Sequence, residues 1–190
     1  MDMRSMVNVY AGPDGGAFGW DLAHFYGIPT FGMAGASDAK IFDAQAAAEA
    51  SLTLFENLLC GANLIHDVGY LDCAMTGSME LVAFCDEVIG WLRRYFRKLE
   101  ISEETLALDL IHEVGPDEHF LESSHTLRHV REDWMPTLFD RLDYHRWAAR
   151  ESTTLQERAN EKVREIIMNH RAEPLPRELV DKLEAVVAGS

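Results

Sequence analysis

Three groups of polar residues follow short apolar runs in the first 72 residues of the chain. The groups are Tyr10 with Gly12 and Asp14; Gly35 with Ser37, Asp38 and Lys40; and His66 with Asp67, Tyr70 and Asp72. The carboxyl ends of parallel strands meet at one rim, where α/β enzymes carry their chemistry. We therefore expect one site there, although Gly, Ser and Asp after a strand are also ordinary turn residues.

The sequence around this rim gives no sign of a protein nucleophile or of a nucleotide-binding loop. The sequence has no GxSxG motif, and no cysteine lies in an activating setting, so a protein nucleophile is not expected. The segment GMAGASDAK (32–40) lacks the spacing of a nucleotide-binding loop. Its glycines would instead let the backbone approach a small ligand closely.

The elements that must position these residues alternate between strand and helix. Strands are expected at 7–12, 30–35 and 62–68, with helices at 13–27 and from the Asp43 cap to Gly61. Short returns between such units favour a parallel sheet with helices outside. From Met79 onward we expect helices at 79–99, 102–115, 154–171 and 177–188, with an irregular stretch at 116–150.

Three parallel strands at the front of a chain do not complete a sheet that needs both faces covered. The sequence therefore predicts an α/β fold that is the C-terminal part of a (βα)8 TIM-type barrel, followed by a mostly helical tail. Residues 1–100 would form the last βα units. Residues 101–190 would form a helical C-terminal extension that packs on the barrel. The front would be missing or supplied by another chain.

Composition excludes several classes of protein. The net charge of −15, from 32 acidic and 17 basic residues, repels phosphate backbones and argues against a nucleic-acid partner. No apolar run is long enough to cross a bilayer, and the N-terminus lacks the pattern of a signal peptide. Three cysteines without a CxxC motif fit reduced thiols in a cytoplasmic protein.

The second half contains histidines that raise the question of a metal. His125 and His129 in HTLRH have the i, i+4 spacing that can hold zinc, but no cysteine or paired carboxylate motif nearby completes a tetrahedral ligand set. HEVGPDEH (112–119) is not an HExxH motif. We expect no directly bound metal, and keep a metal-dependent enzyme centred on this histidine pair as an alternative. The basic cluster RRYFRK (93–98) reads as a solvated helix face or a patch for an acidic partner.

Two long runs carry a family resemblance. The run from SDAKIFDAQ to CDEVIGWLRR, and EVGPDEHFLESSHTLRHVREDWMPTLFDR followed by ERANEKVREII, resemble the trimethylamine methyltransferase family. The likeness extends from about residue 1 to 185 in unbroken order. It implies a (βα)8 barrel more than twice this length, of which this chain is the C-terminal part.

The resemblance also implies a reaction. Members of the family transfer a methyl group from a methylated amine to the Co(I) of a corrinoid carried by a separate protein. One branch acts on trimethylamine and carries pyrrolysine. The larger branch lacks it and acts on quaternary amines such as glycine betaine. We expect the special residue near 32–40, where only common amino acids stand, which favours the quaternary-amine branch.

Roles for the rim residues follow from holding a cation. Aromatic faces and carboxylates bind quaternary ammonium groups, and His66 would orient a substrate carboxylate or a neighbouring acid. The predicted catalytic residues are His66, Asp67 and Asp38, and the predicted substrate-binding residues are Tyr10, Phe31, Gly35, Ser37, Lys40 and Tyr70. The expected partners are the corrinoid protein, a small amine, and the missing barrel half or a second copy. The alternative is an inactive or split-chain fragment that serves as an assembly module.

Overall fold

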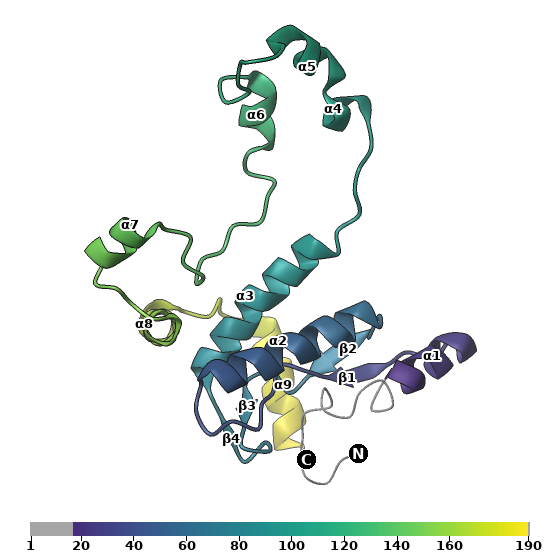
Figure 1. Ribbon diagram of the computed structural model, residues 1–190. Coiled ribbons are helices and arrows are strands. Elements are labelled where there is room, and N and C mark those ends of the chain that lie inside the picture. The colour runs from purple at the N-terminus through teal and green to yellow at the C-terminus, as the bar shows by residue number, and fades with distance from the viewer. Residues whose placement is uncertain (1–16, 190) are drawn as a thin grey trace.

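The computed structural model describes residues 17–189, in which helices predominate and strands are short (Figure 1). The N-terminal half contains α1 (Ala17–Tyr26), β1 (Phe31–Met33), α2 (Ala44–Leu59), β2 (Leu64–His66), β3 (Tyr70–Leu71), β4 (Thr76–Gly77) and α3 (Met79–Tyr95). The C-terminal half contains α4 (Glu103–Leu106), α5 (Leu108–Val114), α6 (Ser124–His129), α7 (Tyr144–Ala149), α8 (Leu155–Asn169) and α9 (Arg177–Ala188).

The strands β1 and β2 form a parallel pair in which Phe31 faces Leu64 and Met33 faces His66. Helix α2 covers one face of this pair. A side chain at Gly32 would collide with Asn57 of α2, so glycine permits the close approach of helix and strand. Phe31 and Leu64 point to the opposite face, where both are 65% exposed. One face of the pair is therefore covered and the other is open and apolar.

Local signals explain where α2 begins and ends. The Asp43 carboxylate accepts hydrogen bonds from the backbone N–H groups of Gln45 and Ala46, which satisfies two donors that a helix start leaves free. At the other end Gly61 has a φ of +72°, a conformation that suits glycine and turns the chain into β2. The predicted helix from Asp43 to Gly61 is confirmed.

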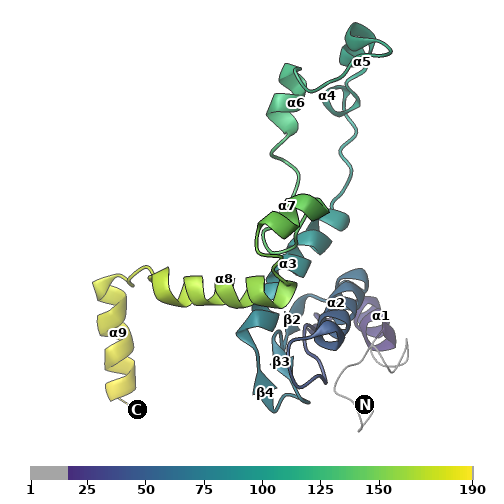
Figure 2. The ribbon, with the colours of Figure 1, turned by 60° about the vertical axis from the view of Figure 1, so that its left-hand side comes forward.

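The hydrophobic core lies between α2, α3 and α8. Leu54, Leu81 and Ala159, one from each helix, are at most 1% exposed. Each helix contributes apolar residues at helical spacing, so burial of these stripes fixes the three helices against one another. In Figure 2, α8 leads away from this core and carries α9 at its far end.

A second contact area joins α3 to residues 133–139, a segment far along the chain. The buried Glu87 carboxylate accepts hydrogen bonds from the backbone N–H groups of residues 137–139 and from the Thr137 hydroxyl. One and two turns further on, Trp134 lies against Gly90, and Arg94 pairs with Asp133 at 2.6 Å. One stripe of α3 therefore fixes this returning segment.

Between these anchors the chain forms an arm, residues 97–132, that contains α4, α5 and α6. Both views show it extending away from the core, joined by two extended segments (Figures 1 and 2). No residue from 93 to 137, a stretch that the structure describes throughout, is buried. The arm therefore owes its shape to local hydrogen bonds and ion pairs rather than to a core.

Several predicted elements differ in detail. The helix expected at 102–115 is two short helices, because Ala107 adopts a left-handed conformation with a φ of 47°. The helix expected at 79–99 ends at Tyr95, and the stretch called irregular contains α6 and α7. The last helix has the predicted bounds, 177–188. The strand predicted at 7–12 lies outside the described residues.

Among the described residues, none of the helices has both the length and the apolar character needed to cross a lipid bilayer.

Candidate functional site

His66 ends β2 and lies between two other predicted site residues. Its ring stacks on that of Phe31, with centroids 4.2 Å apart and planes 20° from parallel. Its Nδ1 lies 2.8 Å from a carboxylate oxygen of Asp67. The strand register explains the stack, because Phe31 and His66 are diagonal neighbours on one face of a parallel pair. The structure thus brings an aromatic ring, an imidazole and a carboxylate together.

The backbone at Asp67 makes the imidazole–carboxylate contact possible. Asp67 has a φ of 72°, a left-handed conformation that aspartate tolerates better than most residues. A carboxylate on Nδ1 favours the tautomer with hydrogen on that nitrogen, which leaves Nε2 free to accept a hydrogen bond. The Asp67 side chain is 20% exposed and that of His66 38%, so a ligand at the rim has access to the imidazole.

Gly35 and Ser37 lie inside the protein and support the rim. The Ser37 hydroxyl donates a 2.6 Å hydrogen bond to Glu49, a buried carboxylate of α2, and the side chain is 1% exposed. Gly35 has a φ of +76°, and a side chain there would press on Val68. Both residues position the backbone of the loop after β1. Whether a ligand reaches that backbone stays a prediction.

Asp38, Lys40 and Asp72 form a second polar group after the strand pair. The Lys40 ammonium donates to the Asp38 backbone oxygen at 2.7 Å and lies 3.5 Å from the Asp72 carboxylate. The Asp38 carboxylate lies 3.5 Å from the sulfur of Cys73, and this hydrogen bond raises the pKa of the thiol above its ordinary value. Cys73 is therefore a poor thiolate nucleophile at neutral pH.

Backbone hydrogen bonds hold the two loops side by side. The N–H groups of Gly69, Ser37 and Asp72 donate in turn to the oxygens of Gly35, Tyr70 and Ala39, all at 2.9 Å. The ladder of β1 and β2 therefore continues into the rim. Tyr70 is 41% exposed beside this ladder. Tyr10 lies outside the described residues, so its predicted place at the rim stays a prediction.

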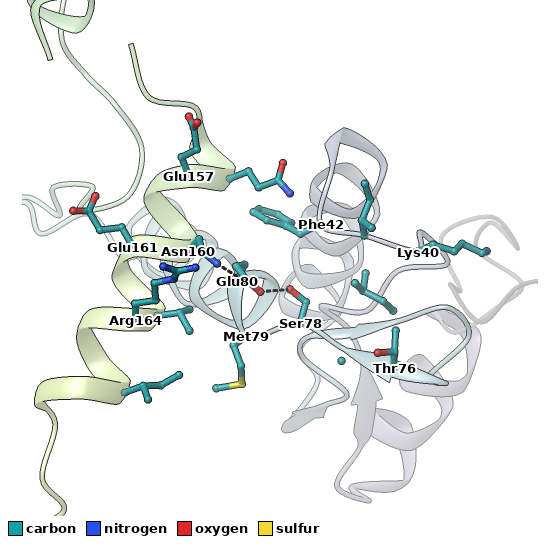
Figure 3. Close-up of a pocket in the computed structure, with 16 residues that line it drawn as sticks. Lys40, Phe42, Thr76, Ser78, Met79, Glu80, Glu157, Asn160, Glu161 and Arg164 are labelled. Atoms are coloured by element: carbon teal, nitrogen blue, oxygen red, sulfur yellow. Dashed lines mark hydrogen bonds between the residues drawn. The ribbon is translucent and has the colours of Figure 1, made fainter. Parts of the chain in front are cut away.

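A hollow of about 1040 Å³ lies between the β3–β4 hairpin and α8 (Figure 3). Of the predicted site residues that the structure describes, only Lys40 lines it. Glu80 forms part of its wall and accepts hydrogen bonds from Asn160 of α8 at 2.7 Å and from Ser78 at 2.9 Å. With its own backbone N–H, these donors hold the pKa of Glu80 below its ordinary value. This contact joins α3 to α8.

Sequence reasoning missed Glu49 and Glu104. Glu49 lies on the buried stripe of α2 with Ala46, Ala50 and Thr53, and a carboxylate at helical spacing within an apolar stripe is a usable signal for a buried polar contact. Glu104 meets His125 and His129, more than 20 residues away, and among the described residues these three form the group with metal-ligand geometry. No local sequence pattern predicts that contact.

Comparison with known proteins identifies the family. The family model described as trimethylamine methyltransferase (MTTB) matches residues 16–189. This chain belongs to the trimethylamine methyltransferase family. It is 36% identical over 86% of its length to trimethylamine methyltransferase MttB of Methanosarcina thermophila, and 36% identical over 98% to the glycine betaine methyltransferase of Desulfitobacterium hafniense.

The match covers a minor part of those relatives. The chain spans 34% of the length of the Methanosarcina thermophila protein and 40% of that of the Desulfitobacterium hafniense protein. The predicted family resemblance is confirmed. The names of these relatives describe the longer proteins, and this chain matches only one part of their sequence.

Proposed function

We propose that this chain forms the C-terminal wall of a methyltransferase that moves a methyl group from a quaternary amine to the Co(I) of a corrinoid protein. The observation that supports it is the one-sided strand pair, with α2 on one face and Phe31, His66 and Asp67 at the other. In a (βα)8 barrel, helices cover the outside and strand residues of the opposite face line the interior. The open apolar face then belongs to the barrel interior.

The proposed reaction needs positioning more than proton transfer. Reduced cobalt, carried by the partner as the methyl acceptor, supplies the nucleophile. A quaternary ammonium has a neutral amine as its leaving group, so no general acid is required. Trimethylamine must first become cationic, by a proton or by an adduct. The residues of this chain therefore have the task of holding a cation in line with its acceptor.

The geometry around His66 suits that task. The Phe31 ring is 65% exposed, so part of its surface is open to a methylammonium group, and the Asp67 carboxylate adds negative charge nearby. The free Nε2 of His66 would orient a substrate carboxylate when protonated, or another acid when neutral. Tyr70, Asp38 and Lys40 would shape the neighbouring part of the rim.

The substrate choice rests on chemistry rather than on similarity. Relatives at 36% identity are named for trimethylamine and for glycine betaine, so identity does not separate the two substrates. The residues from 32 to 40, where we expect the special residue of the trimethylamine branch, are common amino acids. This supports a quaternary amine, with glycine betaine as the first substrate to test.

Methyl transfer to a Co(I) corrinoid protein tests the proposal directly. The chain is assayed alone and together with a polypeptide that supplies the preceding part of the barrel from a relative, with glycine betaine and trimethylamine as separate substrates. We expect demethylation of glycine betaine by the completed assembly. Failure of both amines in an assembly shown by native mass to contain both chains would overturn the enzymatic proposal.

The second candidate function is an assembly module without activity. The exposed apolar residues on α9, Leu179, Leu183, Val186 and Val187, follow helical spacing and favour a further contact. Native mass spectrometry distinguishes the candidates when combined with the assay. A stable complex that transfers no methyl group from either amine supports the module.

A further inference from the structure

The arm contains three side chains that converge although they come from separate helices. Glu104 lies on α4, and His125 and His129 lie one turn apart on α6. One ligand atom from each lies within 4.8 Å of the other two. The Glu104 carboxylate oxygen is 3.0 Å from Nε2 of His129 and 3.9 Å from Nε2 of His125. Zinc bonds of roughly 2.0–2.2 Å in a tetrahedron place ligand atoms about 3.3–3.5 Å apart.

A second carboxylate orients one of these ligands. Glu132 lies 2.8 Å from Nδ1 of His129, on the side of the ring opposite to Glu104. Histidines that bind metals almost always donate their other ring N–H to such a partner, which fixes the tautomer and presents the remaining nitrogen to the metal.

The carboxylate of Glu104 is available as an anionic ligand. The Glu104 carboxylate accepts hydrogen bonds from Arg128, at 2.7 Å, and from His129, at 3.0 Å. Arg128 would keep its hydrogen bond to Glu104 when a metal is bound and so hold the carboxylate in place, since a carboxylate oxygen accepts more than one donor. The Nε2–H of His125 donates to the Glu104 backbone oxygen at 2.8 Å, and a metal would replace that contact.

The arm has no hydrophobic core of its own to hold its helices together. None of its residues is buried, and its helices have four, seven and six residues. Segments too small to build a core are commonly held by a disulfide or a metal, and the three cysteines of the chain lie outside the arm. A hollow of about 590 Å³ between α4, α5 and α6, lined in part by Glu104 and His125, leaves room for a solvent ligand.

We propose that Glu104, His125 and His129 form a Zn²⁺ site that fastens α4 to α6, with Glu132 orienting His129. Two imidazoles and one carboxylate are a ligand set that zinc accepts, with a fourth position for water. This departs from the expectation of no directly bound metal, which followed from the absence of a cysteine or a paired carboxylate motif near the histidines in the sequence. The site does not depend on the proposed methyl transfer.

Zinc binding by the full chain tests this site without any assay of activity. The chain, kept reduced, is titrated with Zn²⁺ against a chromophoric chelator. We expect one equivalent to bind. His129→Gln and His125→Gln should each lower the affinity by more than about 100-fold, and Glu132→Gln by about 10- to 100-fold, as for other residues that orient metal ligands. His112→Gln, on α5 of the same arm, is the matched control and should bind as the parent does.

Two further measurements separate this site from zinc held elsewhere. Imidazole ¹⁵N shifts should move on zinc addition at His125 and His129 and stay unchanged at His112. Zinc should also slow proteolysis between residues 97 and 132. No stoichiometric binding would overturn the proposal. So would binding that Cys73→Ser abolishes and His129→Gln leaves intact, because the metal would then lie on the thiol.

Discussion

The core formed by α2, α3 and α8 and the arm of residues 97–132 are stabilised by different means within one chain. In the core, Leu54, Leu81 and Ala159 are shielded from water, and apolar burial dominates. In the arm, hydrogen bonds and ion pairs among exposed groups such as Glu104 and Arg128 set the local shape. Substitutions in the core should therefore change the free energy of unfolding more than substitutions in the arm.

The largest effect is expected in the core. Leu81→Ala removes a side chain that is 0% exposed and should lower the free energy of unfolding by about 2–5 kcal/mol, because a cavity remains where the side chain packed. Leu121→Ala, at a residue 74% exposed in the arm, is the matched change and should alter it by less than about 0.5 kcal/mol. Urea unfolding measures both. Equal losses of unfolding free energy would show that Leu121 is packed against another surface in solution.

A smaller loss is expected where the arm returns to α3. Glu87→Gln replaces a buried carboxylate, one oxygen of which accepts from three backbone N–H groups, by a neutral amide whose oxygen is a weaker acceptor. The free energy of unfolding should fall by about 1.5–3 kcal/mol. Glu118→Gln, on the exposed arm, controls for the loss of charge. If both variants unfold at the same urea concentration, the carboxylate does not fix residues 137–139.

The open face of β1 and β2 should matter for turnover rather than for stability. In an active assembly, His66→Ala should lower kcat by roughly 10- to 100-fold, because a misplaced substrate loses its alignment with the acceptor. His24→Ala, which removes an exposed histidine bonded to the Gly61 backbone oxygen, is the control and should leave kcat unchanged. If His66→Ala leaves the kinetics unchanged, His66 has only a structural role.

The smallest effect is a dependence of stability on pH at the α3–α8 contact. The pKa of Glu80 is lower in the folded protein than its ordinary value of 4.5, because its backbone N–H, Asn160 and Ser78 donate to the charged form. The stabilisation is therefore complete above pH about 4.5 and is lost as the pH falls through the lower, folded-state pKa. Glu80→Gln should flatten this part of the curve of unfolding midpoint against pH. A curve that stays the same would place the sensitive carboxylates elsewhere.

Short-range features of the fold could be predicted from the sequence. The Asp43 cap, the last helix and the parallel pairing of β1 with β2 follow from caps, periodicity and short returns. The break between α4 and α5 at Ala107 could not be predicted, because alanine has no preference for a left-handed backbone conformation. The barrel itself stays a prediction, since the described residues contain one parallel pair of strands.

The candidate site shows the same division. The stack of Phe31 on His66 follows from strand register, and Asp67 is the next residue along the chain, so the sequence indicated where these residues lie. The contact between Glu104 and His129 spans 25 residues and depends on how two short helices fold back. Pairings of this kind arise from tertiary structure, and a single sequence holds no periodic signal for them.

The left-handed backbone of Asp67 has a consequence for engineering. A glycine would adopt its φ of 72° without steric cost, so a search for stabilising substitutions is drawn to this position. That replacement would remove the carboxylate from Nδ1 of His66, so that neither the orientation of the ring nor its tautomer would be fixed by this contact. Selection for thermal stability alone would thus erode the geometry at the rim, and under the proposed function stability and substrate alignment would be in conflict at Asp67.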